Sequence, residues 1–323
     1  MSLTSLPDER THMQCTGERF IPEIDGDWTP EHKHRYALVA ALCKGKDVLD
    51  VASGEGYGSA HLASVARKVI GVDISGEAVE HAQRAYKNPN LSYRQGSATD
   101  LAAAGLEENS FDVVVSFETI EHLHDHDAML DSLCRVLRPD GLLIISSPDK
   151  REYTDIPNYH NEYHVHELYR EEFEKLLSTR FPNINIYGQR LGYGSLIVAE
   201  ATAPFVTIGE DENLAAITDH LAHAMYYIAI ASHSSLPVLP HSFWKRNIER
   251  SDFAKHWMQM GKEAQDWINT LEARIEEQAE QIKALADEAA VCAQQLHLMT
   301  QSKSWKITKP LRAIFSFFRQ LRR

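Results

Sequence analysis

The strongest restriction on the fold comes from a glycine-rich loop, SGEGYG at residues 53–58, which directly follows the apolar run 47–52. Small residues at such a position let a ligand approach the backbone, and the helix that the loop opens offers unpaired N–H groups at its N-terminus. The sequence therefore predicts a strand, a loop and a helix in that order, with a ligand site at their junction.

Residues 47–148 continue this alternation of short apolar runs and helical patterns. The expected strands are 47–52, 68–74, 91–96, 111–117 and 141–147, and the expected helices between them are 56–66, 77–87 and 127–138. Apolar runs that alternate with helices predict an α/β fold with a doubly wound, mostly parallel sheet covered on both faces. The string RPDG at 138–141 predicts a turn between a helix and the next strand.

The rest of the chain divides by composition and period. A helix is expected at 167–180, a strand at 184–189 and a last strand of the same sheet at 226–231. We expect four segments: an N-terminal cap (1–45), a ligand-binding core (46–240), a helical coiled-coil region (241–303) and a basic amphipathic tail (304–323). The length, 323 residues, suits one core with an appendage.

Charge and cysteine content narrow the functional class. The net charge of −13 argues against a nucleic-acid binder, although all seven charged residues after Glu288 are basic. The four scattered cysteines indicate reduced thiols in a cytoplasm, and the N-terminus lacks the apolar segment of a signal peptide. No apolar run approaches the roughly 20 residues of a membrane span.

Two features of the loop separate a dinucleotide site from a site for a cationic nucleoside. The glycine spacing is G-x-G-x-G, and Asp50 and Glu55 place negative charge where a pyrophosphate would be repelled. S-adenosylmethionine instead brings an ammonium and a sulfonium group. Asp73, at the end of the second strand, is positioned to accept hydrogen bonds from ribose hydroxyls, although a surface Asp in a turn is the plain alternative.

Residues 16–190 resemble a class I S-adenosylmethionine-dependent methyltransferase. The resemblance lies in the strings VLDVASGEGYGS, VIGVDIS, GSATDL, FDVVVSFETIEHL and RVLRPDGLLIISSP. It implies a seven-stranded sheet whose last strand is antiparallel, and S-adenosylmethionine as the cofactor. The strings TGERF (16–20) and EHKHRY (31–36), together with SKSWKITKPLR in the tail, resemble enzymes of bacterial surface-polysaccharide (O-antigen type) biosynthesis.

The resemblance also implies residue roles around the cofactor. Those expected at the methionine part are Asp50, Ala52 (in place of the usual first glycine), Ser53, Gly54 and Gly56. Those expected around the nucleoside are Asp73 at the ribose and Ile74, Ser97 and Ala98 at the adenine, with Asp100 as a substitute for a missing acid and Phe117 nearby. Arg35 is expected to hold the cofactor carboxylate and Tyr36 to close over the sulfonium, unless both belong to a plain amphipathic helix.

Proton removal from an alcohol acceptor favours a histidine as general base. We expect His122 in this role, with Glu118 stacked four residues before it on one helical turn. His124 and His126 are interpreted as exposed loop residues and Asp127 as a helix N-cap. His164 is a candidate acceptor contact, although a structural histidine is the plainer interpretation. The alternation of His164 and His166 could instead place metal ligands on one strand face, but no ligand spacing distinctive of a metal site is present.

The C-terminal third predicts assembly and a membrane surface. Apolar residues recur at alternating steps of three and four from Ile268 to Met299, with Gln278 as the exception. This seam favours a coiled coil and a homo-oligomer over a single helix folded back on the body. The segment from Pro310 predicts a basic amphipathic helix that lies on an anionic membrane or docks on a protein. Together these features favour O-methylation of a sugar hydroxyl in surface glycan synthesis, with another small metabolite as acceptor, or a non-catalytic scaffold, as the alternatives.

Overall fold

The computed structural model describes residues 29–192, 207–208, 217–218, 221, 223–244 and 251–320. They belong to two compact units, Met1–Ser251 and Asp252–Arg323. Some predicted features lie outside the described residues. They are most of the cap segment, including the string TGERF, and residues 321–323 at the end of the tail.

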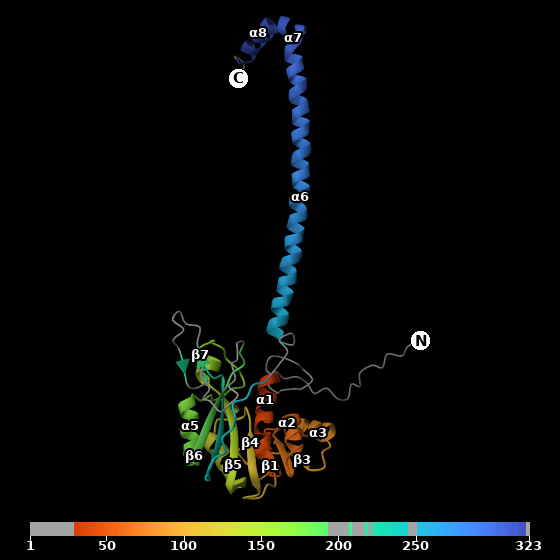
Figure 1. Ribbon diagram of the computed structural model, residues 1–323. Coiled ribbons are helices and arrows are strands. Elements are labelled where there is room, and N and C mark those ends of the chain that lie inside the picture. Colours follow the sequence, from red (N-terminus) through yellow and green to blue (C-terminus); the bar gives the residue numbers. More distant parts are fainter. Residues whose placement is uncertain are drawn as a thin grey trace, which may run out of the picture. The chain divides into compact units, whose positions relative to one another are not determined.

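A seven-stranded sheet forms the centre of the first unit, in the order β3-β2-β1-β4-β5-β9-β6 (Figure 1). The strands are Asp47–Val51 (β1), Lys68–Asp73 (β2), Leu91–Gln95 (β3), Phe111–Ser116 (β4), Leu137–Pro148 (β5), Asn183–Gln189 (β6) and Tyr226–Ser232 (β9). The pairs from β3 to β5 are parallel, whereas β9 runs antiparallel to both β5 and β6. The predicted mostly parallel sheet with an antiparallel last strand is confirmed. Two short strands, Thr207–Ile208 (β7) and Ile217–Thr218 (β8), pair separately.

In the described part of the first unit, five α-helices connect or precede these strands. They are Thr29–Val39 (α1), Tyr57–Ala63 (α2), Gly76–Ala85 (α3), His126–Val136 (α4) and Arg170–Ser178 (α5). The last four lie within or close to the predicted helical segments and are shorter than predicted. The Ser75 hydroxyl accepts a hydrogen bond from the N–H of Ala78 and thereby caps α3, as expected for a polar residue just before a helix.

Two apolar cores cover the two faces of the sheet because alternate strand residues point to opposite sides. On one face, Val48 and Val69 belong to the core that contains Tyr36 of α1 and Leu62 of α2. On the other, the core joins the neighbouring strand residues to α4 and α5; it contains Leu49, Ile70, Val114, Leu130 and Phe173. Burial on both faces explains why these strands read as continuous apolar runs.

The predicted turn at 138–141 is wrong. These residues lie inside β5, where the register slips between the pairs Phe111–Leu137 and Val113–Leu142. The extra residues form a bulge, which absorbs the turn-forming string without ending the strand. Arg138 in this bulge pairs with Asp112 and Asp47, so its side chain ties the starts of three strands together.

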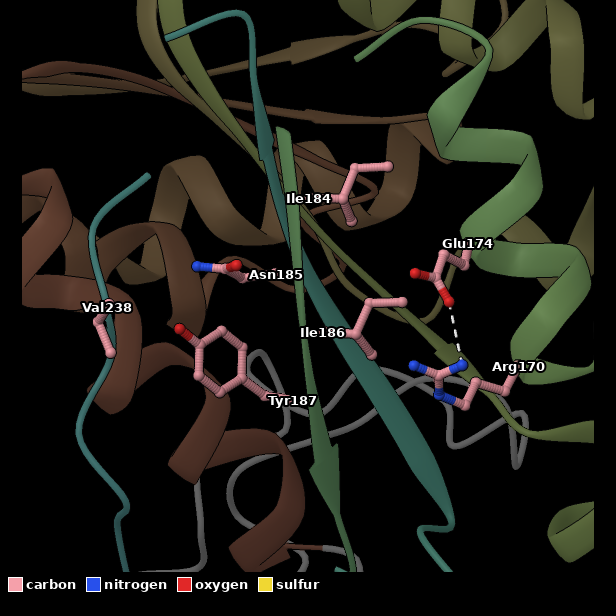
Figure 2. A pocket seen from close by; sticks show the side chains of 7 residues that line it. All are labelled: Arg170, Glu174, Ile184, Asn185, Ile186, Tyr187 and Val238. Carbon is pink, nitrogen blue, oxygen red and sulfur yellow. Dashed lines mark hydrogen bonds and ion pairs between the residues drawn. The ribbon is translucent and has the colours of Figure 1, made fainter. Parts of the chain in front are cut away.

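The edge strand β6 carries a shallow hollow of about 410 Å³ (Figure 2). Ile184 and Ile186 point towards α5, where Arg170 pairs with Glu174 at 3.0 Å, while Asn185 and Tyr187 point to the opposite face. The hollow therefore wraps around an edge strand, and none of its lining residues belongs to the glycine-rich loop.

The second unit is helical. A 50-residue helix, Asp252–Gln301 (α6), is followed by Lys303–Ile307 (α7) and Lys309–Gln320 (α8). α6 contains the whole predicted seam from Ile268 to Met299, and α8 begins one residue before Pro310. The Arg312 guanidinium lies over the Trp305 ring at 3.6 Å and connects α7 to α8. Within the described part of the chain, no helix has the length and apolar character needed to cross a bilayer.

Candidate active site

The glycine-rich loop lies where the parallel strands β1 and β2 end, the edge at which ligands of such sheets bind. The hydrogen bonds that hold the loop include those from the Ser53 N–H to the Val72 carbonyl at 2.9 Å, from the Gly54 N–H to Asp73 Oδ2 at 2.8 Å, and from the Gly56 N–H to the Ser53 carbonyl at 3.1 Å. Asp73, which was expected to bind the ribose, thus also positions the loop.

The loop backbone is left-handed at Ala52 (φ +59°), Gly54 (φ +57°) and Gly56 (φ +100°). At Gly56 a β-carbon would come within 2.7 Å of both the Ala82 β-carbon and the Tyr93 hydroxyl, which itself donates to the Gly56 carbonyl at 2.7 Å. A glycine is therefore required at this position. Ala52 occupies a conformation that favours glycine, which agrees with its interpretation as a replaced loop glycine.

Asp50 does not form part of an open acidic lip. It is completely buried and accepts hydrogen bonds from the Ser59 hydroxyl at 2.6 Å and the Tyr36 hydroxyl at 3.1 Å. Burial raises the pKa of Asp50 to about 7, against which the two hydrogen bonds act. The carboxyl group therefore loses much of its charge near neutral pH, and it ties α1 and α2 to the end of β1.

Glu55, the second acid of the expected lip, is also paired internally. Its carboxylate accepts from the Tyr86 hydroxyl at 2.9 Å and from the Tyr57 N–H at 3.0 Å, and it lies 3.3 Å from His81 Nε2. Asp50 and Glu55 therefore do not form the open acidic lip that was expected at the loop, and cofactor binding by Asp50 stays a prediction. The fold turns both side chains inward, where polar partners compensate their burial.

Asp73 and the residues after it remain at the predicted edge. Both carboxylate oxygens of Asp73 accept loop N–H groups, from Gly54 at 2.8 Å and Ser75 at 2.9 Å. A carboxylate has about four acceptor positions, so two hydroxyls can still bind there. Ile74 follows with 72% of its side chain exposed, an unusual position for an isoleucine and one suited to packing on a flat ring.

The residues expected at the adenine lie across from this position. The chain after β3 passes beside β2, since the Gly96 N–H donates to the Asp73 carbonyl at 3.0 Å. The Ser97 hydroxyl bonds to Thr99 at 2.8 Å, and Ala98 packs against the core. Asp100, considered as a substitute acid, accepts from the Ala103 N–H at 3.1 Å and so supports its own turn.

Arg35 is 1% exposed and reaches from α1 to the ends of other strands. Its Nε donates to Gln189 at 2.6 Å, Nη1 lies 3.2 Å from Glu118 Oε1, and the guanidinium lies over the Tyr226 ring at 4.4 Å. The distance to Glu118 is that of an ion pair, but within the described residues neither Nη1 nor Nη2 makes a hydrogen bond. The unsatisfied donors suit a carboxylate ligand.

Tyr36 and Phe117 belong to the packed core. The two rings meet edge to face at 5.0 Å, and the Tyr36 ring leaves no room for a β-carbon on Gly58. Tyr36 was expected to close over a sulfonium. In the structure the Tyr36 hydroxyl is directed instead to the buried Asp50. Burial accordingly raises the pKa of Tyr36 well above its ordinary value, and the adjacent Asp50 charge adds to this effect.

Glu118 and His122 are not stacked on one helical turn as predicted. The backbone of Glu118 is left-handed (φ +48°) and precedes the short 3-10 helix Ile120–His122 (η2), so no single helical turn carries both side chains. Glu118 accepts from the Ser146 hydroxyl at 2.6 Å, whereas His122 Nδ1 lies 3.0 Å from the Tyr163 carbonyl.

His122 instead contacts His164, the candidate acceptor contact from a distant part of the chain. Their rings contact edge to face at 5.0 Å, and His164 Nδ1 lies 2.6 Å from Glu167 Oε1. The neighbouring Glu121, which sequence reasoning missed, is buried with one carboxylate oxygen lacking a hydrogen-bond partner among the described residues. Burial raises the pKa of Glu121 well above its ordinary value. Its place beside His122 in the sequence was the available signal.

The other histidines of the two clusters are separate from this group. His124 is exposed as expected, but His126 is buried, stacks on His166 at 4.4 Å and starts α4. The cap of α4 is Asp125, whose carboxylate accepts from the Ala128 N–H at 2.9 Å. The interpretations of His126 as exposed and Asp127 as the N-cap are therefore wrong, because the helix begins at His126 and its cap precedes that residue.

One further buried polar atom marks the loop as a ligand site. The Ser53 hydroxyl oxygen is buried and has no hydrogen-bond partner in the described ranges. Buried hydroxyls are nearly always satisfied, so an unsatisfied one at the loop indicates that a ligand completes the site. The hydroxyl, the glycine backbone, Asp73 and Ile74 together fit a nucleoside with a polar extension.

Comparison with known proteins gives the loop region a family context. Residues 49–145 match the sequence profile of the family described as "Methyltransferase domain". Proteins named "Probable S-adenosylmethionine-dependent methyltransferase" from Mycolicibacterium smegmatis and Mycobacterium tuberculosis are 38% and 39% identical to this chain. The alignments cover 52% and 51% of this chain and 64% and 60% of the two relatives.

A relative with a named pathway is more distant. The "Ubiquinone biosynthesis O-methyltransferase" of Albidiferax ferrireducens is 31% identical over 39% of this chain and 52% of its own length. The aligned parts thus span less than two thirds of each of these three relatives.

Proposed function

We propose that this protein is an S-adenosylmethionine-dependent methyltransferase that O-methylates a sugar hydroxyl in bacterial surface glycan biosynthesis. The observation that carries the methyltransferase assignment is the glycine-rich loop at the carboxyl edge of the sheet. Its Gly54 N–H donates to Asp73, and its buried Ser53 hydroxyl has no partner among the described residues. The family match over residues 49–145 and the two mycobacterial relatives support both the activity and the cofactor.

The cofactor would be held by the loop and the end of β2. Ser53, Gly54 and Gly56 would hold the methionine part, with the Arg35 guanidinium as the partner of its carboxylate. Asp73 would accept the ribose hydroxyls, and Ile74 would cover the adenine. When bound, S-adenosylmethionine supplies a methyl group on a positively charged sulfur, so the protein mainly has to align the acceptor.

The acceptor side would be formed by residues after β4 and in the segment around His164. We assign His122 as the group that removes the acceptor proton and His164 as an acceptor contact, with Glu118 near the cofactor or the acceptor. The Tyr163 carbonyl at His122 Nδ1 supports this assignment, since it favours a proton on Nδ1 and leaves Nε2 as the basic nitrogen.

The proposal of a sugar acceptor has two supports. The upstream and tail strings resemble those of surface-polysaccharide enzymes, and the second unit has features that suit a membrane surface. α8 carries exposed Leu311 and Ile314 with basic residues, which suits an anionic membrane surface on which lipid-linked glycans are made. The seam of α6 suits self-association. Similarity to the ubiquinone-pathway relative supports the first alternative, in which the acceptor is another small metabolite. In the second alternative the protein is a scaffold that binds the cofactor without turnover.

Calorimetry with S-adenosylhomocysteine tests the cofactor assignment. We expect binding by the wild-type protein and a loss of about 10–100-fold in Asp73→Asn, because a hydrogen bond to a charged group contributes about 1.5–3 kcal/mol. Asp140→Asn, the same change at an exposed position in β5, serves as the matched control. Tight binding of NADH, with no heat from S-adenosylhomocysteine, would contradict the assignment.

Mass spectrometry of glycans tests the acceptor. Surface glycans from cells with and without the gene should differ by a methyl group on a sugar, and His122→Ala should reproduce the loss. Unchanged glycans together with an accumulated unmethylated metabolite would favour the alternative acceptor. Cofactor binding with full function of His122→Ala would favour the scaffold.

A further inference from the structure

Three side chains from two distant segments converge beside the end of β4. Glu121 and His122 come from η2, and His164 comes from the segment between β5 and α5. One potential ligand atom of each lies within 4.8 Å of the other two, and His122 Nε2 is 3.9 Å from Glu121 Oε1. Donors around a tetrahedral ion with bonds of about 2.0–2.1 Å are about 3.3 Å apart. We propose that Glu121, His122 and His164 bind a divalent transition-metal ion such as Zn²⁺.

The two imidazoles are oriented as metal-binding histidines usually are. His122 Nδ1 is held by the Tyr163 carbonyl at 3.0 Å, and His164 Nδ1 by the Glu167 carboxylate at 2.6 Å. Such partners fix the ring orientation and the tautomer, and they leave Nε2 as the nitrogen that would bind the ion. The Glu167–His164 pair also makes the His164 imidazole a stronger donor. Tyr153 stacks on the His164 ring at 5.0 Å and limits its rotation.

The burial of the Glu121 carboxyl group is a second, independent observation that points to a metal ion. Glu121 is 1% exposed, and its Oε2 atom has no hydrogen-bond partner among the residues that the structure describes. A buried carboxylate is costly unless it is paired or coordinates a metal ion. The backbone around it is fixed, because the Glu121 carbonyl accepts from the N–H groups of Val165 and His166 at 2.9 and 3.1 Å. The same two bonds bring the His164 segment to Glu121.

The donor set selects the class of ion. Two imidazole nitrogens with one carboxylate oxygen suit Zn²⁺, Co²⁺, Fe²⁺ or Mn²⁺, whereas Mg²⁺ and Ca²⁺ prefer oxygen donors alone. Three protein ligands leave at least one coordination position for a water molecule or a ligand oxygen. This is the pattern of a site that takes part in binding or chemistry and not of a closed structural site.

The consequence for the acceptor rests on the proposed function. An ion at this site would bind the acceptor hydroxyl and lower its pKa, so that a solvent water molecule can take up the proton. In the metal-bound protein, His122 and His164 would act as ligands, and the direct proton removal assigned to His122 would apply only without the ion. Metal binding itself does not depend on methyl transfer.

Titration with Co²⁺ tests the site in the full-length protein after chelator treatment and removal of the chelator. We expect ligand-field absorption that rises to about one ion per chain and is displaced by Zn²⁺. His164→Ala and Glu121→Gln should each weaken binding by at least about 10-fold. His166→Ala is the matched control, because this exposed histidine lies two residues from His164 and outside the cluster.

Glu167→Gln provides a graded variant in case His164→Ala does not fold. It keeps all three ligands and should weaken Co²⁺ binding about 10–100-fold through the orientation of His164. The proposal is overturned if the wild-type protein shows no Co²⁺ absorption, if Glu121→Gln binds as tightly as the wild type, or if His166→Ala loses as much affinity as His164→Ala. Calorimetry with S-adenosylhomocysteine on the same samples reports separately on the proposed cofactor site.

Discussion

The Arg35 guanidinium in α1 lies 3.2 Å from the Glu118 carboxylate at the end of β4, and the Ser146 hydroxyl of β5 donates to the same carboxylate oxygen at 2.6 Å. A nearly buried cation thus connects the helix before the sheet to the edge where the candidate site lies. Glu118 has a left-handed backbone, which the bond from its own N–H to Ser146 at 3.0 Å helps to maintain.

We expect a large coupling energy between Arg35 and Glu118. Arg35→Gln should lower the free energy of unfolding by about 3–5 kcal/mol, because it leaves Glu118 without its buried counter-charge. The double variant with Glu118→Gln should lose less than the sum of the two single variants. Urea unfolding measures each value. Arg180→Gln, which breaks the exposed pair with Asp127 and Asp131, should cost less than about 1 kcal/mol; equal costs would contradict the assignment.

Asp50 predicts a pH dependence of stability. Its folded pKa of about 7 lies above the unfolded value near 4, so the folded state binds more protons between these values. The contribution of Asp50 is therefore fully present below about pH 4 and is lost as the pH rises through about 7. In wild type this group makes the free energy of unfolding fall as the pH rises through this window. Asp50→Asn should make that fall less steep. An unchanged slope would show that burial does not raise the pKa of Asp50.

The loop predicts opposite effects of two small substitutions. Ala52→Gly should keep or raise stability, because the left-handed backbone at φ +59° costs alanine about 1 kcal/mol. Gly56→Ala should destabilise the protein by more than about 1 kcal/mol, because its β-carbon would meet Ala82 and Tyr93 at 2.7 Å. Gly45→Ala, at φ +69° with no atom within 4 Å, isolates the backbone cost from the clash. Urea midpoints of the three variants decide the point.

The α6 seam predicts self-association, which we propose occurs through a coiled coil. Ile275 and Ile282 are 64% and 67% exposed, so the seam can bury apolar area against a second copy. The double variant Ile275→Asp/Ile282→Asp should sediment as a monomer. Ala273→Asp/Ala284→Asp, with the same added charge outside the seam, should retain the oligomer. A monomeric wild-type protein in sedimentation equilibrium would refute the seam's role.

The tail predicts salt-sensitive binding to anionic vesicles. Ile314→Asp should weaken co-sedimentation with phosphatidylserine-containing vesicles, because it places a charge on the apolar face of α8. Ala313→Asp adds the same charge on the other side of the helix and should have a smaller effect. Binding by the wild type should fall as salt is added and be weak on neutral vesicles. Equal binding to neutral vesicles, or equal effects of the two substitutions, would count against the membrane proposal.

Local patterns in the sequence determined the order of strands and helices, the doubly wound sheet and the position of the loop. Apolar runs bounded by turn residues specify strands buried on both faces, and the glycines at 54 and 56 specify a left-handed turn. The position of Asp73 at the end of β2 follows from the same local information. These features depend on residues close in the chain, and a single sequence contains them directly.

The tertiary structure alone decided which acids face a ligand and which are buried. Asp50 and Glu55 look like a charged lip in the sequence, but packing of α1, α2 and α3 supplies Tyr36, Ser59 and Tyr86 as their partners. Likewise, the meeting of Glu121 with His164 depends on two backbone hydrogen bonds between distant segments. Burial and proximity across such separations arise from long-range packing, which residue period and turn chemistry do not encode.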